Sequence, residues 1–184
     1  MIFQANYKSV HLLLIKDMSS FDTSPKISII MPNFNGEKHI KKSIDFFLRQ
    51  DYQHKELIIV DGKSTDRSHE IIHEFTEKNE DIHWLQEEDS GISDAFNKGI
   101  DYCEGDIIGY LGSDDLLYKG ILEEIAYQSQ WCEFDAIYFD SYTYYFKERK
   151  CILRKCPELE FSTNNLLSYG TIVGWQDIYF KKYV

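Results

Sequence analysis

The sequence predicts an α/β fold with an open, mostly parallel sheet that carries helices on both faces. The first observation behind this prediction is an alternation, repeated four times within residues 26–125, of a short apolar run and a stretch with helical apolar spacing. The second observation is that the short runs are continuously apolar, which is typical of parallel strands buried on both faces. Helices between parallel strands imply right-handed crossovers, so the alternation favours a single open sheet.

Each repeat consists of a strand followed by a helix. The first repeat is a strand at Ile27–Met31 and a helix at 40–48, where Ile40, Ile44 and Phe47 fall on one face. The same pattern predicts the other three repeats. Their expected strands are at 57–60, 82–85 and 106–111, and their expected helices are at 71–75, 92–100 and 121–125.

The second half of the chain has a different texture, with shorter and more aromatic segments. Ala136–Phe139 resembles a fifth strand. Tyr142–Phe146 and Cys151–Leu153 flank the charged segment Lys147–Lys150. This arrangement predicts a small antiparallel hairpin with a charged turn.

Length and composition indicate one ordinary globular domain. The chain has 184 residues, of which 43% are hydrophobic, enough for a core without disulfides or a structural metal. Residues 1–25 show no clear period, so we expect an N-terminal extension or linker before a domain at 26–184. No apolar run approaches the roughly 20 residues of a membrane-spanning helix. The four cysteines lack Cys-x-x-Cys spacing, so we expect reduced thiols in a cytoplasmic protein.

The charge balance disfavours nucleic acid as a partner. Asp and Glu number 31 against 20 Lys and Arg, which gives a net charge of −11. Phosphates repel such a chain unless a local basic patch intervenes, so we expect no nucleic-acid partner. A phosphate-bearing ligand can still bind if a divalent cation lies between the two negative partners.

The loops after the apolar runs are the predicted ligand site, because open α/β sheets bind ligands at the carboxyl ends of their strands. Three of these four loops carry carboxylates, which repel one another unless a cation or hydrogen-bond donors compensate. Oxygen-rich sites suit Mg²⁺ or Mn²⁺, and Mg²⁺ typically binds one or two carboxylates plus substrate phosphates. The sequence therefore predicts a metal-assisted diphosphate site in the loops 32–35, 61–66, 87–91 and 112–115.

Four ordered segments carry a more specific signal, namely Ser28–Asn35, Glu56–Asp66, Gly91–Gly99 and Gly105–Asp115. In this order and spacing they resemble family 2 glycosyltransferases of the Rossmann-like GT-A fold, of the polysaccharide-biosynthesis type. The resemblance is strong over residues 26–120 and weaker over 121–180. It implies an inverting, metal-dependent transfer of a sugar from a nucleotide-diphosphate sugar, expected to be a UDP-sugar. The implied acceptor is a saccharide or a lipid-linked molecule.

The resemblance also implies roles for individual residues. Asp61 would contact the uracil or the ribose, with Asp94 near the ribose or the sugar. Asp114 and Asp115 would hold Mn²⁺ or Mg²⁺ on the diphosphate, where the metal acts as a Lewis acid on the leaving nucleotide. The expected donor-binding residues are Pro32 and Asn33, which would shape the nucleobase pocket, together with Asn35, Asp61, Ser64, Asp94, Asn97, Lys98 and Asp114.

Three departures from the family pattern bear on the chemistry. Gly62 stands where a second Asp often follows the second strand, and Gly112 stands where the Asp-x-Asp motif begins. The family's general base lies beyond the metal motif. Among the carboxylates after Asp140, Asp177 is the candidate base, although its place between Gln176 and an isoleucine fits a strand better. The resemblance therefore implies truncation at the C-terminal acceptor side, and the alternative function is a non-catalytic nucleotide-sugar-binding domain that lacks the base.

Several of these residues also have structural interpretations. Asp66 fits a helix cap better than a ligand, whereas for Asp61 we favour the ligand role. Asp114 and Asp115 could cap the next helix, but paired carboxylates directly after a buried strand favour a metal. His69 has glutamates beside it on a helical pattern, which indicates a solvated helix face.

The rival function from another class is a nucleotide-dependent oxidoreductase. Its fold needs Gly-x-Gly-x-x-Gly after the first strand, so that the backbone can approach the pyrophosphate. This chain has Pro-Asn-Phe-Asn-Gly at 32–36, which disfavours that rival. The favoured interpretation is a cytoplasmic transferase, and a peripheral association with the inner face of the membrane is left open.

Overall fold

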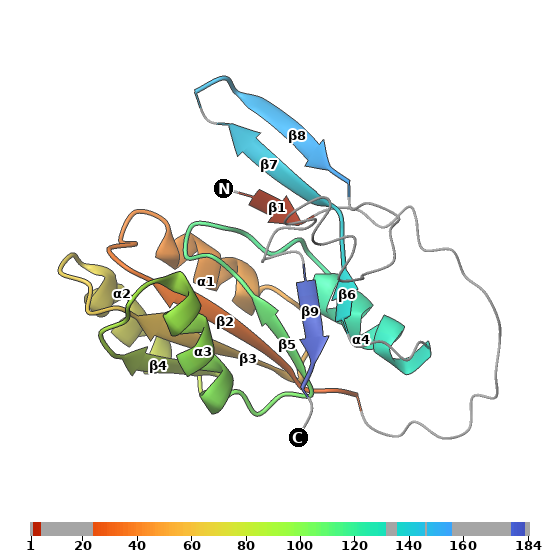
Figure 1. Ribbon diagram of the computed structural model, residues 1–184, viewed down its shortest axis with the longest axis horizontal. Helices are drawn as coiled ribbons and strands as arrows, with labels where there is room; N and C mark the ends of the chain where they lie inside the picture. Colours follow the sequence, from red (N-terminus) through yellow and green to blue (C-terminus); the bar gives the residue numbers. More distant parts are fainter. Residues whose placement is uncertain (1, 5–23, 132–135, 146, 156–177, 183–184) are drawn as a thin grey trace.

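The main feature of the computed structural model is a six-stranded sheet in the order β4-β3-β2-β5-β9-β6 (Figure 1). The structure describes residues 2–4, 24–131, 136–145, 147–155 and 178–182. β2, β3, β4 and β5 pair in parallel, and β9 runs antiparallel to both β5 and β6. The bounds are Ile27–Asn33 for β2, Lys55–Asp61 for β3, Ile82–Gln86 for β4, Ile107–Tyr110 for β5, Ala136–Tyr138 for β6 and Ile178–Lys181 for β9.

Helices cover both faces of this sheet. Alternate residues of β2 point to opposite faces, so Ile29 packs in a core with α1, α2 and α4, whereas Ile30 packs in a second core with α3. Ile44 and Phe47 join the first core from α1, and Phe96 joins the second from α3. These two layers confirm the predicted fold class. The helices are α1 at Ile40–Leu48, α2 at Ser68–Thr76, α3 at Ile92–Tyr102 and α4 at Ile121–Trp131.

β9 enters the sheet between β5 and β6, a position that the sequence did not predict. Its Tyr179 is fully buried against β5. A Cβ atom built on Gly109 of β5 would lie 2.4 Å from the Tyr179 ring, so the glycine leaves room for that ring. The sequence indicated a strand beside Asp177, but local periodicity gives no signal for where such a strand pairs, which is why this position was missed.

A second, three-stranded antiparallel sheet has the order β1-β7-β8. Its strands are β1 at Ile2–Gln4, β7 at Ser141–Tyr145 and β8 at Lys150–Arg154, so the predicted hairpin is present and gains a third strand. Most of the expected N-terminal extension, residues 5–23, lies outside the described part of the chain. Within the described ranges, no helix is long and apolar enough to cross a membrane.

The strand order creates a topological switch point between β2 and β5. From β2 the chain moves outward to β3 and β4, and it then returns through α3 to β5 on the other side of β2. The carboxyl ends of β2, β3 and β5 therefore meet at one edge of the sheet. Ligands of open α/β folds bind in the crevice at such a point.

Candidate functional site

The carboxylate of Asp61, at the end of β3, is the centre of a polar network at the carboxyl edge. It is fully buried. Its Oδ2 accepts hydrogen bonds from Asn33 Nδ2 at 2.6 Å and from Ser64 Oγ at 2.7 Å. Its Oδ1 accepts the Ser64 backbone N–H at 2.8 Å and lies 2.9 Å from His69 Nε2. These donors compensate the cost of burying a carboxylate, so Asp61 organises the loop. Its direct contact with a ligand stays a prediction.

Asn33, at the end of β2, presents a buried acceptor at the switch point. Its side-chain orientation is set by Nδ2, which donates to Asp61 and lies 3.2 Å from Ser64 Oγ. The residue is 3% exposed, and its Oδ1 accepts no hydrogen bond from the residues that the structure describes. A Cβ atom on Gly36 would lie 2.1 Å from this oxygen, so the Asn33 side chain fits here only because residue 36 is a glycine. Buried acceptors normally have a partner, so this oxygen is a candidate ligand contact.

The loops after β2 and β3 are tied together by Asn35. Its backbone N–H donates to Ser64 Oγ at 2.8 Å, and its Oδ1 accepts the Thr65 N–H at 2.8 Å. Asn35 and Lys63 have φ angles of 53° and 58°, in the left-handed region that non-glycine residues rarely adopt. The predicted residues of the first two loops thus form one connected unit.

Asp66 supports the start of α2, which agrees with the predicted cap. Its Oδ1 accepts the Ser68 N–H at 2.9 Å, and its Oδ2 accepts the Glu37 N–H at 2.9 Å. Burial alone would raise the pKa of Asp66, but the hydrogen bonds from Ser68 and the Glu37 backbone lower it below the ordinary value. The Asp66 carboxylate therefore joins the first loop to α2.

The predicted residues on α3 hold the loop between β4 and α3. Asp94 accepts the Ser90 N–H at 2.9 Å, and this hydrogen bond is the main cause of its lowered pKa. Lys98 Nζ donates to the Glu88 carbonyl at 2.6 Å and lies 3.4 Å from Asp94 Oδ2. Asn97 is exposed on the same helix. Asp94 and Lys98 thus form a second group, separate from the Asp61 network.

The acidic turn after β5 presents two carboxylates at the switch point. Asp115 donates its N–H to the Gly112 carbonyl at 2.9 Å. A Cβ atom on Gly112 would lie 2.8 Å from Asp115 Oδ2 and 3.2 Å from Asp114 Oδ1, so both carboxylates lie beside this glycine. Asp115 is 7% exposed, whereas Asp114 is exposed to solvent. Ser43 of α1 holds the turn by donating to the Ser113 carbonyl at 2.9 Å.

The chemistry of this turn fits a metal ion that binds together with a diphosphate. In the described ranges, no three His, Cys, Asp or Glu side chains are grouped to hold a metal. Asp114 and Asp115 supply two carboxylates. Mg²⁺ sites commonly use one or two carboxylates and complete the shell with phosphate oxygens and water. The residues present are therefore sufficient for a metal shared with a substrate.

The prediction that His69 lies on a solvated face is wrong. Its side chain is 32% exposed and contacts Asp61, and its ring lies 5.4 Å from the Trp84 ring. Gln86 Nε2 lies 3.1 Å from His69 Nε2. His69 lies on the first turn of α2, directly after the β3 loop. This short separation from Asp61 along the sequence was the available signal for their contact.

Two other residues at this edge, Phe34 and Asp89, were missed, and Asp89 explains the glycine at position 62. A Cβ atom on Gly62 would lie 2.5 Å from Asp89 Oδ2 and 3.5 Å from the Phe34 ring. The carboxylate of Asp89 thus fills the space that a side chain at 62 would take. Phe34 is 67% exposed, which leaves an aromatic face free at the edge of the sheet.

The last two predicted residues add little to this geometry. Pro32 is partly exposed near the end of β2, where it pairs with Val60 of β3. Asp177, the candidate base, lies outside the residues that the structure describes. Its role stays a prediction.

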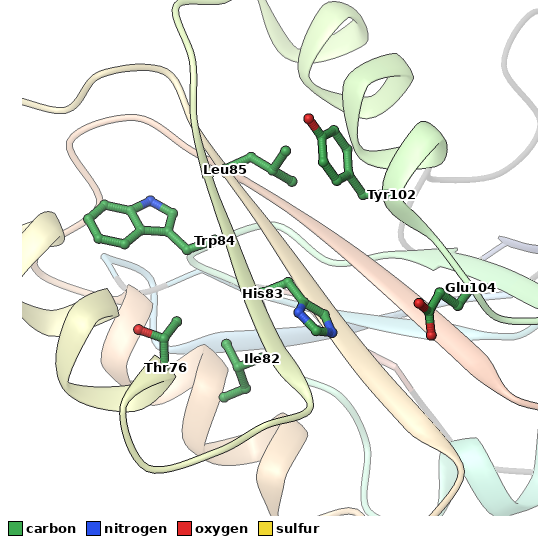
Figure 2. Close-up of a pocket in the computed structure, with 7 residues that line it drawn as sticks. All are labelled: Thr76, Ile82, His83, Trp84, Leu85, Tyr102 and Glu104. Atoms are coloured by element: carbon green, nitrogen blue, oxygen red, sulfur yellow. The ribbon is translucent and has the colours of Figure 1, made fainter.

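A separate groove lies on the outer edge of the sheet, along β4. Figure 2 shows its side chains around this strand, with Thr76 of α2 on one side and Tyr102 of α3 on the other. None of the predicted site residues lines it. Its lining residues are Thr76, Ile82, His83, Trp84, Leu85, Tyr102 and Glu104.

The parallel sheet, its switch point and the acidic turn define an α/β domain whose candidate ligand site lies at the carboxyl edge. Comparison with known protein families identifies the family to which this domain belongs. The chain belongs to glycosyl transferase family 2, whose family model matches residues 28–179. The predicted family and fold are therefore confirmed.

Individual relatives agree with this assignment. The putative teichuronic acid biosynthesis glycosyltransferase TuaG of Bacillus subtilis is 36% identical over 101 residues, which cover 54% of this chain and 40% of TuaG. Staphylococcus aureus TarS 1-349, solved in complex with UDP-GlcNAc, is 26% identical with a TM-score of 0.56, and the match covers 60% of this chain and 33% of TarS. Mannosyltransferase PcManGT from Pyrobaculum calidifontis, solved with GDP-Man and Mn²⁺, has a TM-score of 0.61 at 20% identity, a likeness of fold alone. That match covers 87% of this chain and 45% of PcManGT, so the chain spans less than half the length of each of these proteins.

Proposed function

We propose that this chain binds a UDP-sugar at the carboxyl edge and takes part in transferring the sugar, with inversion, to a saccharide or lipid-linked acceptor. The observation that carries the proposal is the buried Asn33 Oδ1, which lacks a partner among the described residues at the switch point where the acidic turn also lies. The similarity to TarS, which was solved with UDP-GlcNAc bound, supports a UDP-linked donor. The name of TuaG supports a role in cell-surface polysaccharide assembly. We further propose a cytoplasmic location, since Cys103 and Cys151 are free thiols.

The nucleoside would bind between the first two loops. Asn33 Oδ1 would accept a hydrogen bond from an N–H or O–H of the nucleoside, because its Nδ2 is already committed to Asp61. The exposed ring of Phe34 offers a face on which a base can stack. Asp61 would stay buried and keep Asn33 and Phe34 in place, because its carboxylate holds the ends of both loops.

The diphosphate would lie over the acidic turn. Asp114 and Asp115 would hold Mn²⁺ or Mg²⁺, with Asp114 as the solvent-facing ligand. When bound, the metal neutralises charge that develops on the departing nucleotide. The chain's own contribution is to fix the two carboxylates, through the Asp115 N–H to Gly112 carbonyl bond and through Ser43. Asp177 is the proposed base for the acceptor hydroxyl.

Calorimetric titration with UDP, with and without Mn²⁺, tests the donor site. We expect manganese-dependent binding that falls at least about a hundredfold in Asp114→Asn/Asp115→Asn, because the bridge between diphosphate and protein is lost. Glu80→Gln/Asp81→Asn is the matched control, since these adjacent exposed acids precede β4 and their replacement changes the net charge equally. Unchanged affinity in the first variant would overturn the metal assignment. Absence of binding by UDP under both conditions would overturn the donor assignment.

Turnover is tested separately by hydrolysis of a UDP-sugar. The proposal expects hydrolysis that Asp177→Asn reduces while UDP affinity stays the same. Hydrolysis that is unchanged in Asp177→Asn would exclude this residue as the base. Binding without hydrolysis would instead identify a donor-binding domain without transfer.

A further inference from the structure

The turn and outer strand of the β7–β8 hairpin carry a basic surface on an acidic chain. Every residue from 147 to 155 is exposed, and Glu148 is the one acid among them, although the whole chain has a net charge of −11. The ion pairs found between described residues do not include the hairpin's cations. These cations are Lys147, Arg149, Lys150, Arg154 and Lys155.

The same hairpin exposes apolar side chains next to its cations. The strand register places Lys150 opposite Tyr145, and alternation along β8 puts Ile152 and Arg154 on that face as well. Tyr145 is 40% exposed and Ile152 is 37% exposed. One face of the hairpin thus combines two cations with an aromatic and an aliphatic side chain.

The exposed apolar side chains beside the cations help to decide what the cations do, whether they protect a sheet edge, bind a soluble polyanion or bind an anionic lipid surface. Basic residues on an outer strand protect a sheet edge from unwanted pairing. That role does not explain why Tyr145, Ile152 and Leu153 are exposed beside them, because exposed apolar side chains promote association. A soluble polyanion would likewise need only the cations. Cations attract anionic lipid headgroups, while aromatic and aliphatic side chains enter the interfacial layer.

We propose that the β7–β8 hairpin is a docking surface for an anionic lipid bilayer. Figure 1 shows the hairpin projecting away from the six-stranded sheet, with its charged turn at the far end. The hairpin can therefore meet a flat surface while the acidic remainder of the chain stays farther from it. Because the Debye length is about 8 Å at physiological ionic strength, repulsion of that remainder is screened. The inference goes beyond the donor site and needs no nucleotide.

Cosedimentation of the full chain with vesicles tests the proposal. We expect binding to phosphatidylcholine vesicles that contain roughly 30% phosphatidylglycerol, no binding to pure phosphatidylcholine, and release at high salt. Lys150→Gln/Arg154→Gln should weaken binding roughly thirtyfold, since each basic residue near such a surface contributes about a fivefold factor. Lys41→Gln/Lys42→Gln on α1 removes the same charge from another exposed place and should change binding by less than about twofold. Equal losses in the two variants, or equal binding to both vesicle types, would overturn the proposal.

A fluorophore on a cysteine introduced by Ile152→Cys reports whether the docking face itself enters the interface, because alternation along β8 places Cys151 on the opposite face. Cys103 is buried and its burial raises its pKa to about 11, which keeps it unreactive. With Cys132, Cys151 and Cys156 replaced by Ser, an environment-sensitive label should shift its emission to the blue on anionic vesicles, and Tyr145→Ser should reduce that shift. Sedimentation without a shift would overturn the proposal. Binding of soluble polyphosphate in place of vesicles would also overturn it. UDP titration of Lys150→Gln/Arg154→Gln without lipid distinguishes a failure of membrane docking from a failure of the donor site.

Discussion

β3 carries a buried carboxylate near each of its ends, and the two are held in different ways. Near the amino end, Glu56 is 1% exposed. Its Oε1 accepts hydrogen bonds from Ser28 Oγ and from the Glu104 N–H, and its Oε2 lies 2.7 Å from Lys26 Nζ. This network is closed by an opposite charge: Glu56 Oε2 accepts no hydrogen bond of good geometry from the described residues, but it is ion-paired with Lys26. The network joins β2, β3 and the segment before β5.

At the carboxyl end, the network around Asp61 is held by hydrogen bonds but does not close. Asn33 Oδ1 remains without a partner among the described residues, and it fills the place that a Cβ atom on Gly36 would take. The comparison teaches that burial of a carboxylate does not by itself distinguish structure from function. What distinguishes the two ends is that the Glu56 oxygen without a hydrogen bond faces a cation, whereas Asn33 Oδ1 faces no donor among the described residues.

The largest expected effect is at the closed end, from Gly105→Ala. A Cβ atom there would lie 2.7 Å from both the Lys26 carbonyl oxygen and the Ser28 nitrogen, which are backbone atoms that cannot yield easily. We expect the free energy of unfolding to fall by about 3 kcal/mol, as for severe overpacking. Urea denaturation measures this change. UDP affinity of the folded fraction should be unchanged, and a loss of affinity would show that the two ends are coupled.

The next effect is that of Glu56→Gln, expected to lower the free energy of unfolding by about 2 kcal/mol at neutral pH. Burial alone would raise the pKa of Glu56, but hydrogen bonds from Lys26 and Ser28 lower it below 4.5. A depressed folded-state pKa contributes stability above the unfolded-state value, and this contribution is lost as pH falls through the folded-state pKa. The difference between the two proteins should therefore shrink below about pH 4.5. A difference that grows in acid would contradict the assignment.

The sequence predicted the four parallel strands and the sheet edge at which their loops gather, for physical reasons that these residues illustrate. Buried parallel strands such as β2 and β3 are continuously apolar, and their ends fall at one edge whatever the loops do. The contact of His69 with Asp61 and the position of Asp89 over Gly62 depend on loop conformation, including the positive φ of Lys63. Local periodicity carries no information on such contacts, so the sequence could name Asn33 and Asp61 as candidates but not the residues that hold them.

Gly36→Ala is the counterpart of Gly105→Ala at the carboxyl end of β3, the open end, where the network around Asp61 does not close. Here the atom nearest to a new Cβ is the side-chain oxygen of Asn33, at 2.1 Å, and this side chain can move if the hydrogen bond from its Nδ2 to Asp61 breaks. We expect the free energy of unfolding to fall by only about 1 kcal/mol, because a side chain yields more easily than backbone. UDP affinity should fall about tenfold, since the acceptor is displaced. Calorimetry measures the affinity, and unchanged affinity would remove Asn33 from the donor site.

The smallest expected effect is that of His69→Ala, which removes one donor from Asp61. The bond is charge-assisted but its partner is about one-third exposed, so we expect a loss of about 1 kcal/mol in the free energy of unfolding. His73→Ala is the matched control on the same helix, because that side chain is 61% exposed and faces Glu77 at 3.7 Å, a surface pair of small effect. UDP affinity separates a positioning role from a purely structural one. If His69 orients Asp61 toward Asn33, His69→Ala should weaken UDP binding several-fold while His69→Gln, which keeps a donor at this position, restores part of it. Equal UDP affinity in all three variants would show that the open end tolerates the loss of this donor, and that Ser64 and Asn33 alone hold the carboxylate in place.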